Sequence, residues 1–373
     1  MKTSFLTRAA AIALPAVLLL AGCASEQTTA PTEPSAPADL TIPGIFTGDA
    51  TIPAAVDGGL EVALVTRITT GSWYETYAKA VTAEVEGLGG TLQVLDSNND
   101  LAKFASNIDT AVNSGVDVLL INNGTADALN DSVQRALDAG IPVVTYDSDI
   151  TLPGVSSINQ DDAALATNGL TALAEDFNGD AGIVVLSVAG YAPLDRRLAA
   201  VNEFTAKNTG IKVVTQTGTV SGSAALDTAA QIAALLTANQ PGGEIDAIWG
   251  HWNEFTRGAF TALEEAGRKD IAVYTVDLTD QELPYFWNEA VDFRAASATN
   301  PATIGRSQVR QAWVKAAGQQ VGDLLVTPAL IKKSELPASE ISYTQLGDLV
   351  PAWNEDKTEW PAWIKSLHER TGK

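Results

Sequence analysis

The sequence predicts an α/β protein with two doubly wound lobes, each a parallel β-sheet covered by helices on both faces. From residue 61 onward, short apolar runs rich in Val, Ile and Leu alternate with amphipathic stretches long enough to form helices. Near-continuous apolar strands alternating with helices are typical of parallel sheets that are buried on both faces. The chain has 373 residues, which suggests about two domains. Two such α/β halves fit this length.

The expected strands fall into two groups of four. They span 62–65, 92–95, 116–121 and 142–145 in the first half, and 183–187, 211–215, 245–249 and 271–276 in the second. Helices are expected between them over 73–88, 101–114, 126–139 and 224–236. Gly115, Gly140 and Gly267 each follow an expected helix, where the backbone often needs a positive φ. Asn300 followed by Pro301 predicts the start of a late helix.

Composition excludes several function classes. Against 45 acidic residues there are 23 Lys and Arg, a net charge of −22, so the clustered basic surface of a nucleic-acid-binding protein is not expected. A single Cys excludes an intramolecular disulfide and any multi-cysteine metal site. The two histidines, His251 and His368, are too far apart in sequence for a local metal motif. We therefore expect no metal and no cofactor.

Catalytic motifs are also missing from the sequence. It contains no Gly-x-Ser-x-Gly elbow, no P-loop and no dinucleotide fingerprint. Asp96, Asn98 and Asp100 resemble the opening of an EF-hand loop, but Leu101 and Asn107 stand where that loop needs Gly and Glu. We therefore expect a binding protein rather than an enzyme.

The first segment predicts export and lipid anchoring. Lys2 and Arg8 precede an apolar run over 9–20, which is shorter than the ~20 apolar residues that a membrane-spanning helix needs. The following Leu20-Ala21-Gly22-Cys23 resembles the lipobox of bacterial lipoproteins. That resemblance implies a signal peptide over 1–22 and a diacylglycerol on Cys23; the alternative is an ordinary secretory signal that ends near a cysteine. Residues 23–59 are rich in Ser, Thr, Pro and Ala, which predicts a flexible tether. The expected location is extracytoplasmic, lipid-anchored to the bacterial cell membrane.

Aromatic and polar residues stand just after the expected strands. In open α/β sheets, ligands bind outside the carboxyl ends of the strands. Ring faces can pack on the C–H surface of a sugar, while carboxylate, amide and guanidinium groups bind its hydroxyls. The pattern therefore predicts a site for a polyhydroxylated ligand. The residues at this rim include Trp73, Tyr74, Asp147, Arg197, Trp252, Asn253 and Asp277.

Taken together, these pieces resemble the sugar-binding proteins of bacterial ABC importers, of the ribose-binding type with the periplasmic binding protein type I fold. The resemblance covers roughly residues 60 to 332 and depends on the order and spacing of several short segments. They include Val62-Ala63-Leu64-Val65, Leu95-Asp96-Ser97-Asn98-Asn99-Asp100, Ala139-Gly140-Ile141-Pro142-Val143-Val144 before Asp147, Asp246-Ala247-Ile248-Trp249-Gly250-His251-Trp252-Asn253-Glu254, and Val276-Asp277.

The resemblance implies two lobes joined by a three-segment hinge, with crossovers near 157–161, 298–300 and 327–330. The first lobe would comprise 60–159 and 300–328, and the second 160–299 and 329–333. A C-terminal extension over 334–373 lies beyond the resemblance. Because it carries Trp353, Trp360 and Trp363, we expect it to lie against the lobes or across the hinge.

The resemblance also implies roles for single residues. Trp73 and Tyr74 would stack on the sugar; any one tryptophan could instead be a core residue. Asp147 would be the first-lobe carboxylate, Arg197 the second-lobe arginine, with Arg196 as its competitor, and Asp277 the second-lobe aspartate. The ligand contact after the strand 245–249 would be Trp252 or Asn253. Two family positions differ here: Thr299 stands where the family often has Gln, and Ser148 replaces an arginine of the ribose-specific proteins. We therefore expect a ligand of the sugar class but do not expect ribose in particular.

The function expected from the resemblance is capture of a monosaccharide or sugar-like polyol by hinge closure, followed by delivery to an ABC permease. The alternatives are a sugar sensor that presents its closed form to a membrane receptor, and a secreted glycosidase with paired carboxylates. The expected partners are the sugar, the permease and the membrane through the lipid on Cys23, with no nucleic acid and the chain as a monomer. Asp147 and Arg197 are expected to be exposed at the rim and Trp73 to contribute little to the core.

Overall fold

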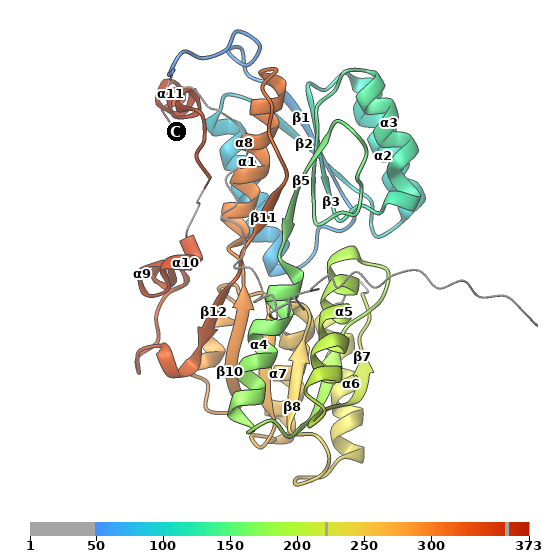
Figure 1. Cartoon of the computed structure of the whole chain (residues 1–373), viewed down its shortest axis with the longest axis vertical. Helices are drawn as coiled ribbons and strands as arrows, with labels where there is room; N and C mark the ends of the chain where they lie inside the picture. Colours follow the sequence, from blue (N-terminus) through green and yellow to red (C-terminus); the bar gives the residue numbers. More distant parts are fainter. Residues whose placement is uncertain (1–48, 221–222, 355–357, 373) are drawn as a thin grey trace, which may run out of the picture. The chain divides into compact units, whose positions relative to one another are not determined.

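The computed structural model describes residues 49–220, 223–354 and 358–372. The expected signal peptide, Cys23 and most of the expected tether lie outside these residues. Within them, the chain forms two six-stranded sheets flanked by helices (Figure 1). In this part of the chain, no helix has the length and apolar character needed to cross a membrane. The predicted fold class, two doubly wound parallel-sheet lobes, is confirmed.

The first sheet has the strand order β11-β5-β4-β3-β1-β2, and all of its strand pairs are parallel. Helices α1 and α8 cover one face and α2 and α3 the other (Figure 1). The elements of this lobe are β1 (Glu61–Thr66), α1 (Ser72–Gly87), β2 (Thr91–Asp96), α2 (Leu101–Ser114), β3 (Val118–Asn122), α3 (Ala126–Asp138), β4 (Val143–Tyr146), β5 (Val155–Gln160), α8 (Pro301–Ala316) and β11 (Leu324–Val326).

Strand β1 shows why the first lobe has near-continuous apolar strands. Val62 and Leu64 pack in the core beneath α1 and α8, whereas Ala63 and Val65 pack in the core beneath α2 and α3. Successive side chains of a strand point to opposite faces, so a strand covered on both sides needs apolar residues at every position.

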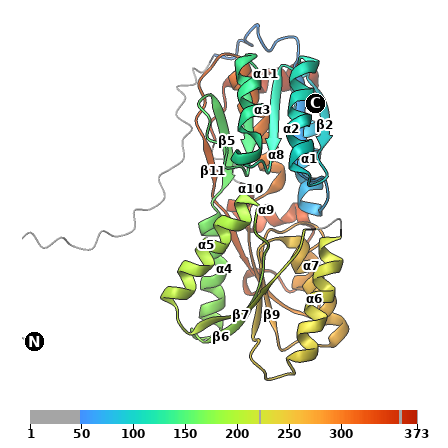
Figure 2. The ribbon, with the colours of Figure 1, turned by 90° about the vertical axis from the view of Figure 1, so that its right-hand side faces the viewer.

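The second sheet has the order β12-β10-β9-β8-β6-β7 and is parallel except for the antiparallel pair β10–β12. Helices α6 and α7 cover one face and α4 and α5 the other (Figure 2). Its elements are α4 (Asp162–Asp176), β6 (Ala181–Leu186), α5 (Ala192–Lys207), β7 (Ile211–Thr217), α6 (Ala224–Ala238), β8 (Ala247–Gly250), α7 (Asn253–Ala266), β9 (Ala272–Val276), the 3-10 helix η1 (Leu283–Phe286), β10 (Asp292–Ala298) and β12 (Ala329–Lys332).

The chain passes from one sheet to the other three times. It crosses after β5, after β10 and between β11 and β12. The strands next to these crossovers (β5, β10, β11 and β12) are the ones that the sequence pattern did not indicate. Their residues explain this: β5 alternates half-buried with buried positions, β10 begins with Asp292 and Arg294, and β11 has three residues.

The C-terminal extension packs on both lobes. It contains the 3-10 helices η2 (Lys333–Glu335) and η3 (Tyr343–Gln345) and the helices α9 (Leu346–Leu349), α10 (Pro351–Asn354) and α11 (Ala362–Thr371). Trp353 is buried in the core of the second lobe, and Trp363 and Leu367 are buried in the core of the first. The Asn354 Oδ1 also accepts a hydrogen bond of 3.0 Å from the Asn300 side chain at the second crossover.

Candidate functional site

A cavity lies between the two lobes and takes its walls from both. The loops after β1, β3, β4 and β5 contribute from the first lobe, and the loops and helix starts after β6, β7, β8 and β9 from the second. These are the carboxyl ends of the strands, where the sequence places the site. The lining residues are Ile68, Thr70, Trp73, Tyr74, Asn122, Asn123, Tyr146, Asp147, Gln160, Tyr191, Pro193, Leu194, Arg197, Val220, Trp252 and Asp277.

Asp147 and Asp277 occupy equivalent places in the two lobes. Each directly follows a buried strand, β4 or β9, and each has a positive φ, 45° for Asp147 and 71° for Asp277. Positive φ is uncommon outside glycine, and Asp and Asn are among the residues that tolerate it. Both side chains are buried, which corrects the expectation that Asp147 would be an exposed rim charge.

Arg197 lies at the centre of a buried charge network. Its Nε donates a 2.7 Å hydrogen bond to Asp162 Oδ1, and its Nη1 donates one of 2.7 Å to the carbonyl oxygen of His251. The same Nη1 lies 3.8 Å from Asp277 Oδ2. The Arg197 side chain is 3% exposed, so this residue too is not the exposed rim charge that was expected.

The competing residue, Arg196, joins the same network from its outer side. Its Nε donates to Asp162 Oδ2 at 2.7 Å, and its Nη2 lies 3.9 Å from Asp147 Oδ1. The Arg196 side chain is 37% exposed and is not among the lining residues of the cavity. Both arginines thus donate hydrogen bonds to the Asp162 carboxylate, and of the two, Arg197 lines the cavity.

Burial shifts the pKa values of this network. It raises the pKa of the Asp277 carboxyl to about 7, although the neighbouring Arg197 opposes the shift. Burial likewise raises the pKa of Asp162, again against the effect of Arg197. Burial disfavours the charge of Arg197, but Asp162, Asp277 and Asp147 outweigh it and raise the pKa of its guanidinium. Burial lowers the pKa of His251 to about 3, so this imidazole is neutral near neutral pH.

Several lining atoms are buried and have no hydrogen-bond partner among the described residues. They include the indole Nε1 of Trp73, the amide Oδ1 of Asn122 and the carboxylate Oδ1 of Asp277. Buried polar groups in proteins are nearly always hydrogen-bonded, so atoms of this kind facing a cavity suit a ligand with hydroxyl groups. They come from both lobes, and one ligand can satisfy both sets.

Trp73 belongs to the cavity wall and to the core. Its ring stacks on Tyr146, with centroids 5.3 Å apart and planes 5° apart, and on Tyr77 at 5.7 Å and 18°. Trp73 is 7% exposed and packs in the core of the first lobe. The expectation that it supports little of the core is therefore wrong, because its stack with two tyrosines ties the wall to the first sheet. Tyr74 lies beside it in the wall, and burial raises the pKa of its phenol to about 12.

Gln160, at the first crossover, is a lining residue that the sequence argument missed. Its side-chain amide donates 2.8 Å hydrogen bonds to Asp147 Oδ2 and to the Tyr146 hydroxyl. The Thr299 hydroxyl donates to Gln160 Oε1, and Thr299 does not itself line the cavity. The structure therefore places Thr299 behind Gln160. The available signal was the unusual Thr299: the Gln that the resemblance implies at this second crossover is present here at the first.

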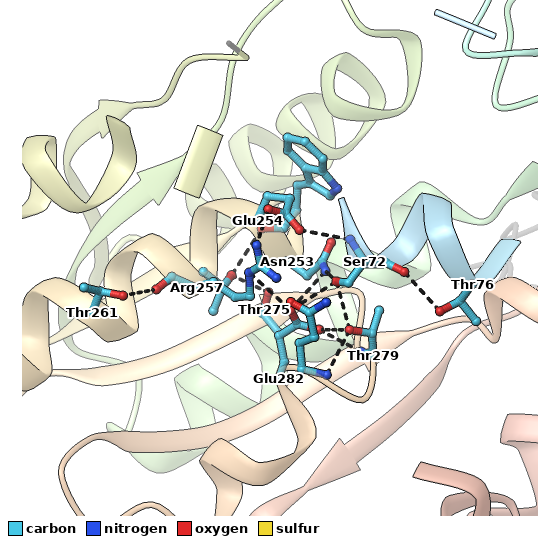
Figure 3. Close-up of polar contacts among 12 residues, drawn as sticks. Ser72, Thr76, Asn253, Glu254, Arg257, Thr261, Thr275, Thr279 and Glu282 are labelled. Carbon is cyan, nitrogen blue, oxygen red and sulfur yellow. Dashed lines mark hydrogen bonds and ion pairs between the residues drawn. The ribbon is translucent and has the colours of Figure 1, made fainter. Parts of the chain in front are cut away.

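The structure separates Trp252 from Asn253. Trp252 lines the cavity, whereas Asn253 is buried outside its lining in a polar cluster between the lobes (Figure 3). The Asn253 amide donates to Ser72 Oγ at 2.8 Å and to Glu282 Oε1 at 3.1 Å. The Thr279 hydroxyl donates to the same Ser72 Oγ at 3.0 Å. We call Ser72, Asn253, Glu254, Thr279 and Glu282 the interlobe cluster.

This cluster caps a helix of one lobe with a carboxylate of the other. Helix α1 begins after Gly71, which has no side chain to accept a hydrogen bond and whose φ is 101°. The backbone N–H of Ser72 donates instead to Glu254 Oε1, at 3.2 Å (Figure 3). Negative charge is favourable at a helix N-terminus, so Glu254 contributes to the contact between the lobes.

A second contact between the lobes involves Arg67, which is also buried. Its Nη1 donates to the carbonyl oxygen of Gly190 at 2.7 Å, and its guanidinium lies 3.7 Å from the centre of the Tyr191 ring. The Tyr191 hydroxyl and the Arg67 Nε both donate to Asn99 Oδ1, at 2.7 and 2.9 Å. Asn99 belongs to the segment after β2 that the sequence argument quoted without assigning it a role.

A cavity between two α/β lobes, with three crossovers and polar groups from both sides, defines a two-lobed solute-binding protein. The chain belongs to the periplasmic binding protein domain family, whose model matches residues 62–320. This confirms the predicted resemblance. In the described residues, no group of three or more His, Cys, Asp and Glu side chains is arranged to hold a metal ion.

Curated relatives and solved structures agree with this family. The chain is 26% identical to a xylitol-binding protein of Mycolicibacterium smegmatis over 69% of this chain and 71% of the relative. It is 27% identical to the ribose import binding protein of Escherichia coli over 62% and 76%, respectively. Among structures, a 5-methylthioribose transporter solute-binding protein from Thermotoga lettingae superposes with a TM-score of 0.82 and 31% identity, covering 86% of this chain and 100% of that one. A sugar ABC transporter structure from Yersinia enterocolitica gives 0.82 and 29%, covering 87% and 99%.

Proposed function

We propose that this chain is the solute-binding protein of an ABC importer and captures a monosaccharide or a sugar-like polyol between its lobes. The observation that carries the proposal is the set of buried, unpartnered polar atoms on Trp73, Asn122 and Asp277, three residues that line one cavity from both lobes. Similar proteins are named for binding xylitol, for importing ribose and for transporting 5-methylthioribose, which supports testing neutral pentose-like compounds first.

The lobes bind the ligand by closing on it. Asp147 and Trp73 belong to the first lobe and Arg197 and Asp277 to the second, so a ligand meets all four only when the lobes are together. A ligand that binds one arrangement more tightly shifts the population toward it. Hydrogen bonds to charged groups contribute about 1.5–3 kcal/mol each. A few of them with one ring contact account for the roughly −8 kcal/mol of micromolar binding.

The test is a binding screen with neutral pentoses, hexoses and polyols, read by thermal denaturation and then by titration calorimetry. A ligand at about 100 times its Kd adds ~2.7 kcal/mol of stability. Asp147→Asn and Asp277→Asn should each weaken binding at least about tenfold, which corresponds to ~1.4 kcal/mol. Asp109→Asn is the matched control, because Asp109 pairs with Arg135 at an exposed position outside the cavity. If no sugar or polyol binds, the proposal fails.

The lipid anchor is a further part of the proposal. The lipobox-like segment ending at Cys23 supports attachment of the chain to the outer face of the cell membrane, where it would deliver the sugar to the permease as a monomer. Replacing Cys23 with Ser should move the protein from the membrane fraction to the medium. Unchanged retention in the membrane fraction would contradict the anchor. Deleting the protein should abolish uptake of the sugar found in the screen, and light scattering should give the mass of one chain.

A further inference from the structure

The Asp277 carboxylate depends on its backbone for its position in the cavity. Its Oδ1 has no hydrogen-bond partner among the described residues, and its Oδ2 lies 3.8 Å from Arg197. The equivalent carboxylate of the first lobe, Asp147, is instead held by a 2.8 Å hydrogen bond from the Gln160 side chain. Asp277 also has a φ of 71°, and a residue other than glycine keeps such a conformation only where the surrounding structure holds it. The segment after β9 therefore decides where this carboxylate lies.

That segment, residues 277–282, is held by two different parts of the chain, and we call it the Asp277 loop. On the sheet side, the backbone N–H of Asp277 donates to the carbonyl oxygen of Ser297 in β10 at 3.1 Å. On another side, the Tyr343 hydroxyl of the C-terminal extension donates to the carbonyl oxygen of Leu278 at 3.3 Å. Leu278 directly follows Asp277, so Tyr343 restrains the residue next to the one that lines the cavity.

Tyr343 is itself anchored in the second lobe. Its ring meets Trp353 edge to face, with centroids 5.7 Å apart and planes at 88°, which is a favourable arrangement for two aromatic rings. Trp353 is buried in the same core as Leu278. Burial raises the pKa of the Tyr343 phenol, and the three carboxylates of the Asp277 loop raise it further. The phenol thus lies close to the loop and connects it to a buried part of the extension.

Tyr343 lies beyond residues 62–320, which match the family, and it is not among the lining residues of the cavity. We propose that Tyr343 is a positioning residue for ligand binding, because it holds the Asp277 loop where the Asp277 carboxylate can meet a hydroxyl group of the ligand. A binding group is most effective when neighbouring residues restrain it in the productive geometry. This inference rests on the proposed function and gives the C-terminal extension a part in it.

The first test is a double-mutant cycle, measured by titration calorimetry of the whole chain with the sugar or polyol found in the screen. Tyr343→Ala should weaken binding about tenfold, or ~1.4 kcal/mol, and Tyr343→Phe, which keeps the ring, should restore part of the affinity. Asp277→Gly removes the carboxylate and accepts the positive φ. In that background Tyr343→Ala should cost no further affinity, because the group that Tyr343 positions is gone.

The matched control is Trp363→Ala, which removes an aromatic ring of the same extension that is buried in the first lobe instead. The folded fraction of this variant should bind with the affinity of the unaltered chain. An equal loss from Tyr343→Ala with and without the Asp277 side chain, or no loss in either background, overturns the positioning role and leaves the proposed function intact.

The second test needs no ligand and follows amide hydrogen exchange, which reports local opening. In Tyr343→Ala the amides of the Asp277 loop should exchange faster, whereas those of β8 in the same lobe should exchange as in the unaltered chain. Trp363→Ala should leave the loop unchanged. Unchanged exchange of the loop in Tyr343→Ala, or an equal increase in β8, overturns the inference. If no sugar or polyol binds, the proposed function fails, and exchange still decides whether Tyr343 holds the loop.

Discussion

Replacing Arg197 with Ala should destabilise the protein as well as weaken binding. Arg197 shares the buried Asp162 carboxylate with Arg196, each at 2.7 Å, and among the described residues it is the cation that pairs with buried Asp277, at 3.8 Å. Removing one partner of a buried ion pair costs about 3–5 kcal/mol, because the remaining charge is left buried without compensation. This is a large part of the roughly 5–15 kcal/mol that typically separates folded from unfolded states. The sequence alone predicted almost no loss, because it placed Arg197 at an exposed rim.

The pH dependence provides an independent check. The pKa of Asp277 is about 7 in the folded chain against an ordinary value of 3.8, so between these values the folded state holds a proton that the unfolded state has lost. The contribution of Asp277 to the free energy of unfolding is therefore full below about pH 4 and falls as the pH rises through 7. Without Arg197, which opposes this shift, the pKa of Asp277 should rise further and the fall should become larger.

The assay is urea denaturation at pH 5 and pH 8, with Arg135→Ala as the control. Arg135 forms an ion pair with Asp109 in which both side chains are exposed, and such pairs contribute only about 0–1 kcal/mol. We expect Arg197→Ala to lose several times more stability than this control at pH 8, and to recover part of the loss at pH 5. Equal losses in the two variants at pH 8, with the same pH dependence, would refute the reasoning about the buried network.

Three other substitutions test separate features. Trp73→Ala should cost about 3–5 kcal/mol of stability as a buried aromatic, and calorimetry on the folded fraction should also show affinity reduced by roughly 1–3 kcal/mol. Glu254→Gln removes the negative charge at the start of α1, which contributes about 0.3–1 kcal/mol to the contact between the lobes. Small-angle scattering should therefore show a larger share of open molecules. An unchanged scattering profile would contradict the capping role of Glu254. Trp363→Ala should lower the free energy of unfolding by about 3–5 kcal/mol, and a thermal midpoint like that of the unaltered chain would show that α11 is not needed by the first lobe.

The fold was predictable because a strand that is buried on both faces has apolar residues at nearly every position. In β1 every residue from Val62 to Val65 is apolar, and the same holds for most of the central strands. Beside the crossovers, β5 lacks that pattern, because Ser156 and Gln160 bond to other segments of the hinge region. Strands β11 and β12 are mostly apolar but only three and four residues long. Local patterns do not show which segments such residues will meet.

The site was predictable in position and only partly in detail. Asp147 and Asp277 stand directly after buried strands, and order along the chain is enough to place them at the cavity. The separation of Trp252 from Asn253 was not predictable, because it depends on where α7 begins: Trp252 is the N-cap and Asn253 the first helical residue, so their side chains leave in different directions. The burial of Arg197 depends on Asp162, a residue of another helix that approaches it only in the folded chain.

The buried charge network also bears on which charged metabolites can bind in the cavity. Three carboxylates, those of Asp147, Asp162 and Asp277, surround the two guanidinium groups, and Arg197 already gives its Nε and Nη1 to protein acceptors. A phosphate group brought to this network would meet these carboxylates, and Arg197, the arginine that lines the cavity, already donates two hydrogen bonds to protein acceptors. We therefore expect the charge of phosphorylated pentoses and of uronic acids to weaken their binding at this site.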